Sequence, residues 1–354
     1  MSTPVHILRK RVTALAKRKL HPQKSLEWFR QRQTKITASE AASCLYKTEE
    51  DCNGYLRDFV YKYKMNGKGM NSFKSKEEFI ISKCLEYYGT SQYTDNHSTL
   101  HGKRFEDVAS KFYCNLKNTS MIEFGLLDHH TLSWLGASPD GITRDGVMLE
   151  IKCPNVRRIK LNEFPVYYWV QMQIQLEVCD LDECDYIECD IRQVNEEDFH
   201  DLPDDKYPGL ILRKPGTEEY IYPPFDIITI IDHLVWLGTQ DQSLECVFYY
   251  IEEYQLLNVK RDREWFKCVK PKLKETFDII HKFQLDKDAW DKHYNEYLGI
   301  KNKKFNDFFE SSECIIQDDT IHDKYPNIAN LDDFDIEMSG VSEIKWPGTE
   351  CMIE

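Results

Sequence analysis

The sequence predicts an α/β (α+β) fold in which a central mixed β-sheet is flanked by helices and followed by a mainly helical C-terminal extension. Apolar residues recur at helical spacing from His101 to Leu116, and a hairpin pattern with an Asp-Gly turn follows over 140–152. Further along the chain, strand-like and helical segments alternate, which is typical of a mixed sheet covered by helices. The strand-like segments are 121–128, 132–137 and 184–194, and the helical segment is 161–179.

Composition divides the 354 residues into four regions. These regions are a basic N-terminal arm at 1–24, a core at 25–205 with an insertion at about 50–98, a helical extension at 206–304 and an acidic tail at 305–354. The extension is predicted to be helical because it is rich in Trp, Tyr, Phe and Ile. The tail has few periodic apolar positions, so we expect no packed core there.

The net charge of −14 is unevenly distributed. Residues 1–35 carry ten Lys or Arg and one acidic residue, whereas 180–205 carry twelve acidic residues and 305–354 carry thirteen. A basic arm in an acidic chain is compatible with a local nucleic-acid surface. For the acidic blocks, a solvated face or tail is the favoured interpretation.

Cysteine usage and hydropathy indicate the environment of the chain. The twelve cysteines include no C-x-x-C pair, and scattered cysteines in a chain of this length suggest a reducing compartment rather than a disulfide framework. No apolar run approaches the roughly 20 residues that cross a bilayer, and the basic start lacks the apolar segment of a secretory signal. We therefore expect an intracellular, soluble protein that does not contact membranes.

The predicted hairpin carries a set of residues suited to phosphodiester hydrolysis. Glu150 and Lys152 are two apart on one strand, so both side chains point to one face. Ile151 points into the core and offers its backbone carbonyl, and Asp140 precedes the other strand. Carboxylates can hold Mg²⁺, which neutralises a phosphate and lowers the pKa of a water, and a lysine can position that water or stabilise the developing charge. The alternative is an exposed hairpin with ordinary surface charges.

The position of Asp140 requires a further assumption. Simple counting around an Asp145-Gly146 turn pairs residue 140 with residue 151, which would place the Asp140 side chain on the wrong face. We predict that Pro139 and Gly141 release Asp140 from regular pairing and let it turn toward Glu150.

Two helical segments offer supporting residues. Glu106 lies at the border of an apolar face and can reach a metal directly or through a water; an ordinary ion pair is the alternative. Gln171 and Gln175 share one face of the 161–179 helix, where neutral amides can orient a water or phosphate oxygen. The alternative for these amides is an exposed helix side.

An anion pocket is predicted near the start of the core. The segment Thr37-Ala38-Ser39-Glu40 fits a capping box, and Arg32 lies just before it. A helix N-terminus with a hydroxyl and an arginine can bind phosphate. The alternatives are a first-turn serine and a surface ion pair.

Five motifs in one order resemble the lambda exonuclease-like, YqaJ-type viral recombinase nucleases of the PD-(D/E)xK superfamily, and together they cover roughly residues 25–195. They are Trp28-Phe29-Arg30-Gln31-Arg32 with Ile36-Thr37-Ala38-Ser39-Glu40, Gly102-Lys103-Arg104-Phe105-Glu106, Ser138-Pro139-Asp140-Gly141, Leu149-Glu150-Ile151-Lys152-Cys153-Pro154 and Tyr168-Trp169-Val170-Gln171-Met172-Gln173. The resemblance implies a restriction-endonuclease-like core. Large DNA viruses carry relatives, which implies a location in the host cytoplasm or nucleus.

The resemblance also implies roles for individual residues. Asp140, Glu150 and the Ile151 carbonyl would bind metal, Lys152 would serve the attacking water, Glu106 would support the metal site and Gln171 would lie close to it. Arg32, Ser39 and Ser138 would hold a 5′-terminal phosphate. The implied cofactor is Mg²⁺, with two ions per site and Mn²⁺ as a substitute.

The implied reaction is 5′→3′ digestion of one strand of linear double-stranded DNA, in viral recombination, replication or repair. A trimeric ring and a single-strand annealing partner are implied as well. The basic arm, the insertion and the chain after about residue 205 depart from the shared pattern. Two alternatives therefore stay open: a structure-specific endonuclease, and a non-catalytic DNA-binding scaffold on the same fold.

Overall fold

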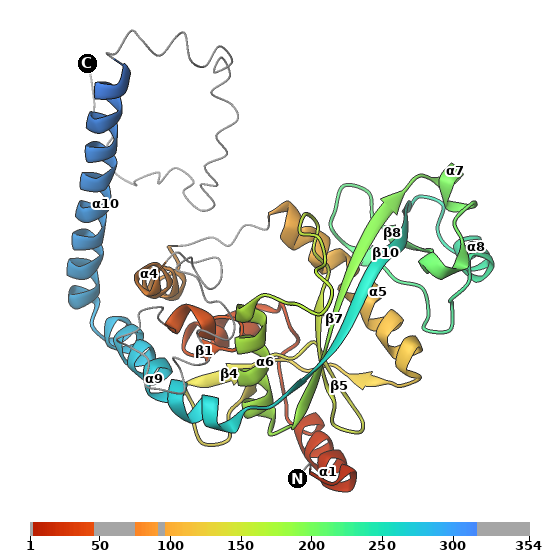
Figure 1. The fold of residues 1–354 in the computed structure, drawn as a ribbon, viewed down its shortest axis with the longest axis horizontal. Helices are drawn as coiled ribbons and strands as arrows, with labels where there is room; N and C mark the ends of the chain where they lie inside the picture. The colour runs from red at the N-terminus through yellow and green to blue at the C-terminus, as the bar shows by residue number, and fades with distance from the viewer. Residues whose placement is uncertain (1–2, 46–74, 91–95, 317–354) are drawn as a thin grey trace, which may run out of the picture. The chain divides into compact units, whose positions relative to one another are not determined.

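The computed structural model describes residues 3–45, 75–90 and 96–316. The chain divides into two compact units, 1–285 and 286–354. The larger unit contains a curled mixed sheet (Figure 1). Its strands are β2 (Met121–Ile122), β5 (Gly141–Thr143), β6 (Met148–Lys152), β7 (Glu183–Val194), β8 (Gly209–Arg213), β9 (Tyr220–Ile221) and β10 (Glu245–Lys260). They lie in the order β2-β5-β6-β7-β10-β8-β9, with β6 and β7 parallel and the other neighbours antiparallel.

The described part of this unit also contains a second, smaller sheet and a set of helices. The small sheet consists of β1 (Ile36–Thr37), β4 (Leu135–Ala137) and β3 (Leu127–Asp128), in that order. The helices are α1 (Val5–Ala16), α2 (Leu26–Gln33), the 3₁₀ helix η1 (Ala41–Cys44), α4 (Lys76–Tyr87), α5 (His97–Lys117), α6 (Val166–Cys179), α7 (Glu196–Phe199), the 3₁₀ helix η3 (Asp204–Lys206), α8 (Ile230–Leu237) and α9 (Arg263–Leu285). This arrangement confirms the predicted mixed sheet flanked by helices.

Helices α5 and α6 lie on opposite sides of the centre of the sheet (Figure 1). Leu149 and Ile151 of β6 are buried in one core cluster with Phe105 of α5 and Ile187 of β7. Glu150, between them, accepts hydrogen bonds from α6. Successive side chains of a strand alternate between faces, so β6 presents apolar residues to α5 and its polar residues to α6, as predicted.

The basic arm contains a helix that packs on the core. Leu8, Val12 and Leu15 of α1 are all buried, and their i, i+4, i+7 spacing forms one apolar stripe. Arg9 forms an ion pair with Asp145 of the β5–β6 turn, which ties the outer face of α1 to the hairpin. The arm is therefore fixed beside the hairpin that carries the candidate site.

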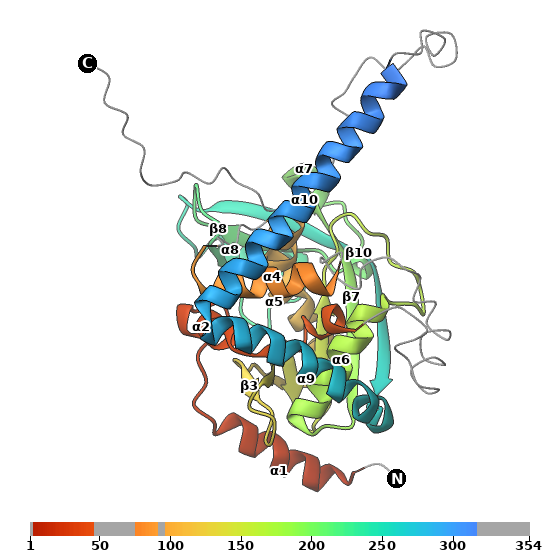
Figure 2. The same cartoon turned by 90° about the vertical axis from the view of Figure 1, so that its left-hand side faces the viewer.

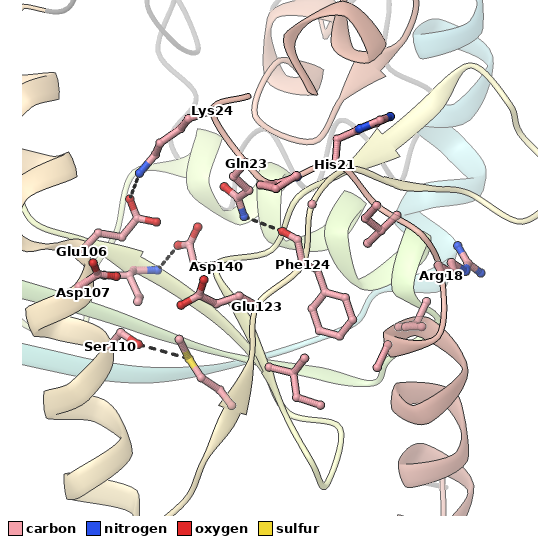
Figure 3. Close-up of a pocket in the computed structure, with 18 residues that line it drawn as sticks. Arg18, His21, Gln23, Lys24, Glu106, Asp107, Ser110, Glu123, Phe124 and Asp140 are labelled. Carbon is pink, nitrogen blue, oxygen red and sulfur yellow. Dashed lines mark hydrogen bonds and ion pairs between the residues drawn. The ribbon is translucent and has the colours of Figure 1, made fainter. Parts of the chain in front are cut away.

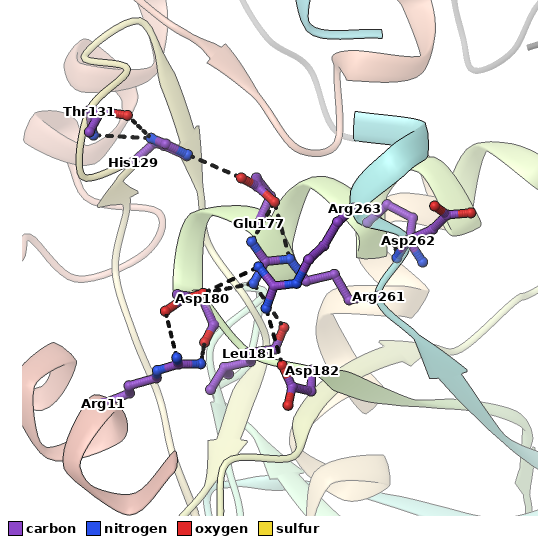
Figure 4. A network of polar contacts seen from close by, with 11 residues as sticks. Arg11, His129, Thr131, Glu177, Asp180, Leu181, Asp182, Arg261, Asp262 and Arg263 are labelled. Atoms are coloured by element: carbon purple, nitrogen blue, oxygen red, sulfur yellow. Dashed lines mark hydrogen bonds and ion pairs between the residues drawn. The ribbon is translucent and has the colours of Figure 1, made fainter. Parts of the chain in front are cut away.

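A buried arginine joins the end of β10 to the end of α6 (Figure 4). Arg261 is only 6% exposed and forms ion pairs with Glu177 and Asp180. Arg11 of α1 reaches Asp180 from the other side, with its Nη1 donating to the Asp180 carbonyl at 2.6 Å. Paired charges of this kind are costly to break one at a time, because the remaining partner stays desolvated.

The segment after residue 205 contains the predicted helices, and it also contains strands that the sequence did not predict. Three strands, β8 to β10, join the main sheet, and β10 pairs with β7 along nearly its whole length. The aromatic residues that suggested helices instead cover the sheet; Phe248 and Tyr249 of β10 are buried. Aromatic and β-branched residues are common both in strands and in buried helices. A high content of these residues therefore could not distinguish a strand from a helix. Helix α8 lies between β9 and β10, and further helices follow from Arg263 onward.

Helix α9 packs on α4, α6 and η1 (Figure 2). Trp265, Val269 and Leu273 are buried along its inner side. In the second unit, α10 (Lys287–Ile316) continues past the predicted start of the acidic tail at 305. The rest of that tail, 317–354, lies outside the described residues. In the parts of the chain that the structure describes, no helix has the length and apolar character required to cross a membrane.

The first part of the core also differs in detail. A second helix was expected to start at the Thr37–Glu40 capping box, but β1 and the four-residue η1 occupy this segment. Ile36 pairs with Leu135 in the small sheet, so tertiary pairing overrides the local helical pattern. Of the predicted insertion, helix α4 and the start of α5 are described, and most of the remainder lies outside the described residues.

Candidate active site

The register of the β5–β6 hairpin differs by one residue from simple counting. Gly141 pairs with Leu149, and the Thr143 N–H donates to the Val147 carbonyl at 2.8 Å. The turn therefore has three residues and ends at Gly146, whose φ of +86° is the left-handed conformation that glycine adopts without cost. This register brings Asp140 level with Glu150, so the predicted pairing of 140 with 151 was wrong.

Asp140 lies just before β5 begins at Gly141, as expected. Its Oδ2 accepts a hydrogen bond from the backbone N–H of Ile151 at 2.7 Å. Burial raises the pKa of Asp140 well above its usual range, and the nearby carboxylates of Glu150 and Glu106 raise it further. The carboxyl group is therefore held in a position where negative charge is poorly compensated.

Glu150 is completely buried and surrounded by donors. Gln171 Nε2 donates to its Oε1 and Gln175 Nε2 donates to its Oε2, each at 2.7 Å. Lys152 Nζ forms an ion pair with the same carboxylate. The predicted proximity of Gln171 to the hairpin is thus present, and Gln175, which is also 0% exposed, completes the enclosure. The alternative interpretation, in which both glutamines lie on an exposed side of α6, does not fit these contacts.

Lys152 lies at the boundary of the site, with its side chain 22% exposed. Its Nζ is 4.7 Å from the centroid of the Tyr168 ring, a distance that permits a cation–π contact. Burial lowers the pKa of Lys152, but Glu150 and Asp140 outweigh burial and the pKa is raised well above its usual value. The ammonium group is held as a cation between an acid and an aromatic face.

A cavity of about 520 Å³ opens beside Asp140 (Figure 3). Ile151 and Glu106 also line it. The N–H of Ile151 points to Asp140, away from β7, and the carbonyl of a strand residue points to the same side as its N–H, so the Ile151 carbonyl faces this edge. Glu106 Oε2 forms an ion pair with Lys24 at 3.3 Å. Both interpretations of Glu106 therefore apply: it lines the site and it has a lysine partner.

Sequence reasoning missed several residues of this cavity. Asp107 follows Glu106, and Glu123 belongs to the segment after β2, whose register places it beside Gly141. Gln23 and Lys24, from the chain before α2, form another part of the wall. The spacing of these residues forms no recognisable motif, since α5, β2 and the N-terminal segment meet only in the folded chain.

The oxygen atoms at this edge suit a hard cation. Among the described residues, no three His, Cys, Asp or Glu side chains form a group able to hold a metal. The donors available are instead the Asp140 and Glu150 carboxylates and the Ile151 carbonyl, with Glu106 on the opposite wall. Mg²⁺ is usually held by one or two carboxylates and completes its shell with water and substrate oxygens. The crowded acidic groups around Asp140 fit such an ion, because a cation would relieve their repulsion.

The predicted anion-binding residues also come together. Trp28 Nε1 donates to Ser138 Oγ at 3.0 Å, and Arg32 Nη2 donates to Ser39 Oγ at 3.2 Å. The Arg32 guanidinium lies over the Trp28 ring, 4.4 Å from its centroid. Ser138 is two residues from Asp140, so this cluster adjoins the acidic site. Glu40 makes one of the two predicted capping-box bonds by accepting the Thr37 N–H at 2.9 Å. Thr37 itself belongs to β1, and the four-residue η1 begins after Glu40.

Two acids and a lysine lie at the adjoining ends of β5 and β6, on a mixed sheet between two helices, which is the arrangement expected from the sequence. Residues 27–182 match the YqaJ-like viral recombinase domain family. This match confirms, for that stretch of the chain, the resemblance seen in the sequence.

Comparison with individual proteins gives more distant matches. An uncharacterized protein of Acanthamoeba polyphaga mimivirus is 25% identical over 324 residues, 76% of this chain and 54% of that protein. The chain thus spans about half the length of this relative. Among solved structures, the alkaline exonuclease LHK-Exo of Laribacter hongkongensis in complex with dAMP has a TM-score of 0.45 at 20% identity, over 79% of this chain and all of that chain. A phage-related exonuclease from Haemophilus somnus has a TM-score of 0.41 at 11% identity, over 70% of this chain and 94% of that chain.

Proposed function

We propose that this protein is a Mg²⁺-dependent deoxyribonuclease, and specifically a 5′→3′ exonuclease on linear double-stranded DNA. The observation that carries the proposal is the juxtaposition of Asp140, which lines the cavity, with Glu150 and Lys152 of the adjoining strand. The match of residues 27–182 to a viral recombinase domain supports the same activity. The acidic net charge is no obstacle, because the N-terminal segment provides a concentrated basic surface.

The cofactor in this proposal is Mg²⁺, with two ions per site and Mn²⁺ as a substitute. Asp140, Glu150 and the Ile151 carbonyl would hold it, with Glu106 in support. When bound, the metal neutralises charge on the phosphate and lowers the pKa of a bound water. The protein keeps these oxygens in place beforehand: the Ile151 N–H fixes Asp140, and two amides fix Glu150.

Lys152 supplies the positive charge that the chain itself contributes at the reacting phosphate. Its Nζ can donate to the attacking water or to a phosphate oxygen, and Tyr168 limits the directions in which the side chain can move. Gln171 and Gln175 donate to Glu150 without adding charge. The two amides satisfy the Glu150 oxygens in a buried position and fix the orientation of the carboxyl group.

The polarity of digestion is proposed from the anion-binding cluster. Arg32, Ser39 and Ser138 would hold a 5′-terminal phosphate next to the acidic site. Water attacks the phosphorus of the next linkage, the bond to the 3′ oxygen breaks, and that oxygen takes a proton as the nucleotide leaves. The shortened strand then ends in a new 5′-phosphate, the group that the same cluster binds.

The biological role proposed with this activity is viral DNA recombination, replication or repair. The 3′ single strand left by digestion is a substrate for a single-strand annealing protein, which is the proposed partner. A homotrimer is proposed by the same resemblance. Size measurement of the purified chain tests the trimer, and co-purification with the candidate annealing protein tests the partner.

Digestion of linear duplex DNA labelled separately at each end tests the activity and its direction together. With Mg²⁺, we expect early release of the 5′ label and late release of the 3′ label. A 5′-phosphate should accelerate the reaction, and EDTA should stop it. Intact DNA under all conditions would contradict the proposed enzyme, and binding alone would favour the scaffold alternative. Cleavage of closed circular DNA would favour an endonuclease.

A further inference from the structure

The chain before α2 forms part of the catalytic cavity although it precedes the matched domain at 27–182. Lys24 lies on this wall with Glu106 and Asp140 (Figure 3). Its Nζ is 3.3 Å from Glu106 Oε2, and its side chain is 48% exposed. A lysine is therefore paired with a candidate metal-supporting carboxylate, and it has room to move.

The backbone fixes Lys24 firmly in this position. On one side, Gln23 Nε2 donates to the Phe124 carbonyl at 2.8 Å and to the Pro139 carbonyl at 3.2 Å. On the other side, Ser25 caps α2 by accepting the Trp28 N–H at 3.2 Å. Lys24 itself has a φ of +68°, the left-handed region that residues with a side chain rarely adopt. Strained positions of this kind persist where neighbouring contacts enforce them, often at functional sites.

The charges in the cavity define what Lys24 can do. Glu106, Asp107, Glu123 and Asp140 all line it, so the Lys24 ammonium faces an acidic wall. A metal cation bound near Glu106 would replace Lys24 as the charge partner of the Glu106 carboxylate. The freed ammonium would then lie at the mouth of the same cavity, close to where a DNA phosphate must enter. Lysine binds phosphate as a compact point charge on a flexible stem, so a short swing suffices.

We propose that Lys24 is a phosphate-binding residue of the active site, which neutralises Glu106 in the free protein and turns to the DNA backbone when a metal ion binds. This inference rests on the proposed nuclease function and extends it to a residue outside the matched domain. It assigns the N-terminal segment a direct part in the site, in addition to its packing on the core.

The first test measures metal binding without DNA or turnover. Calorimetry with Mn²⁺ compares the wild type with Lys24→Met, Lys24→Arg and Lys19→Met. Lys24→Met should bind Mn²⁺ severalfold more tightly, because no lysine competes for Glu106, and Lys24→Arg should remain close to the wild type. Lys19 is exposed in the same segment but does not line the cavity, so Lys19→Met should leave the Mn²⁺ affinity unchanged.

The second test measures the phosphate contact. Lys24→Met should raise KM for linear duplex DNA roughly tenfold. It should also lower the slope of log KM against log salt concentration by about 0.9, the contribution of one phosphate contact. Lys24→Arg should retain most of the affinity. Lys24→Gly suits the backbone conformation and should unfold at an equal or higher temperature while losing the same affinity, which separates charge from folding.

Two results would overturn the inference: Mn²⁺ affinity of Lys24→Met equal to the wild type, or an unchanged salt slope. A wild-type chain that cleaves no DNA would defeat the proposed function separately. In that case, Mn²⁺ calorimetry still tests competition at Glu106, and fluorescence anisotropy with duplex DNA and Mn²⁺ replaces KM as the measure of the phosphate contact.

Discussion

The Asp140 carboxylate accepts the backbone N–H of Ile151 at 2.7 Å. This bond fixes the acid of one hairpin strand against the strand that carries Glu150 and Lys152. Because the bond uses backbone, the position of Asp140 depends on hairpin register rather than on any neighbouring side chain. The geometry of the candidate site is therefore sensitive to the turn that sets this register.

Removing either charge of the proposed catalytic set should abolish the proposed nuclease activity without unfolding the protein. We expect Asp140→Asn and Lys152→Ala to lower Mg²⁺-dependent DNA degradation by on the order of 10³-fold. Asn can still accept the Ile151 N–H, and it removes a carboxylate whose pKa is raised by burial and by Glu150. Asp140→Asn should consequently melt at the same temperature or higher. Asp145→Asn, in the exposed turn of the same hairpin, serves as the control; degradation that survives in both site variants would refute the assignment.

The turn glycine should influence activity from a distance. Gly146 has a φ of +86°, and an added Cβ would lie 2.7 Å from Leu8 Cβ. Gly146→Ala should cost about 1–2 kcal/mol for the left-handed backbone and more for the contact with α1. We also expect a loss of activity on the order of 10²-fold, because a shift of about 1 Å at Asp140 is sufficient for such a loss.

Gly89→Ala is the matched control for this prediction. Gly89 has a φ of +71°, but an added Cβ meets no atom within 4 Å. It should lose stability by the backbone cost alone and keep its activity. Equal activity loss in the two alanine variants would show that register is not the cause.

Alternation along β6 and the order of the motifs could be predicted from sequence. Side chains two residues apart on a strand point to the same face, so the shared orientation of Glu150 and Lys152 follows from local geometry alone. The pairing partner of Asp140 could not be predicted in the same way, because the Asp145-Gly146 sequence is compatible with both a two-residue and a three-residue turn. The difference of one residue decides on which side Asp140 lies.

Contacts between distant segments set the limit of sequence reasoning elsewhere. Lys24 and Glu123 reach the cavity only because α2, β2 and β5 meet in the fold. Similarly, β10 contains enough aromatic residues to resemble a buried helix, and only its pairing with β7 identifies it as a strand. The spacing of apolar residues predicts which side chains share one face of a helix or strand. It does not predict which other element packs against that face, because this depends on the tertiary fold.

The amides of α6 should stabilise the buried acid. Gln175→Leu removes one donor from Glu150, which is 0% exposed. A buried charged acceptor that loses a partner costs about 1–3 kcal/mol. Denaturant unfolding should therefore show lower stability for Gln175→Leu. The same change in a Glu150→Gln background should cost clearly less, and equal costs in both backgrounds would argue that packing, not charge, is responsible.

The anion-binding cluster should determine the preference for a 5′-phosphate. Arg32 bonds Ser39 and stacks on Trp28. Arg32→Met should remove a tenfold or greater preference for phosphorylated ends, which corresponds to about 1.4 kcal/mol or more. Initial rates on duplexes with and without a 5′-phosphate measure this ratio. Arg30→Met changes an exposed arginine of the same helix and should leave the preference intact; a ratio that persists in Arg32→Met would place the phosphate elsewhere.

Acid should weaken the protein through Glu177. Burial raises the pKa of Glu177, but the neighbouring His129 imidazole and hydrogen bonds from Arg261 outweigh burial and hold this pKa down to about 2. The folded pKa lies below the unfolded value near 4.3, so the stabilisation is complete above about pH 5 and is lost as the pH falls toward 2. The amount is about 3 kcal/mol, at 1.36 kcal/mol per unit. Urea unfolding at pH 7, 5 and 3 should show a flatter profile for Glu177→Gln than for the wild type, whereas Glu264→Gln, an exposed change in α9, should follow the wild type. A Glu177→Gln profile as steep as the wild type would mean that other carboxylates account for the acid sensitivity.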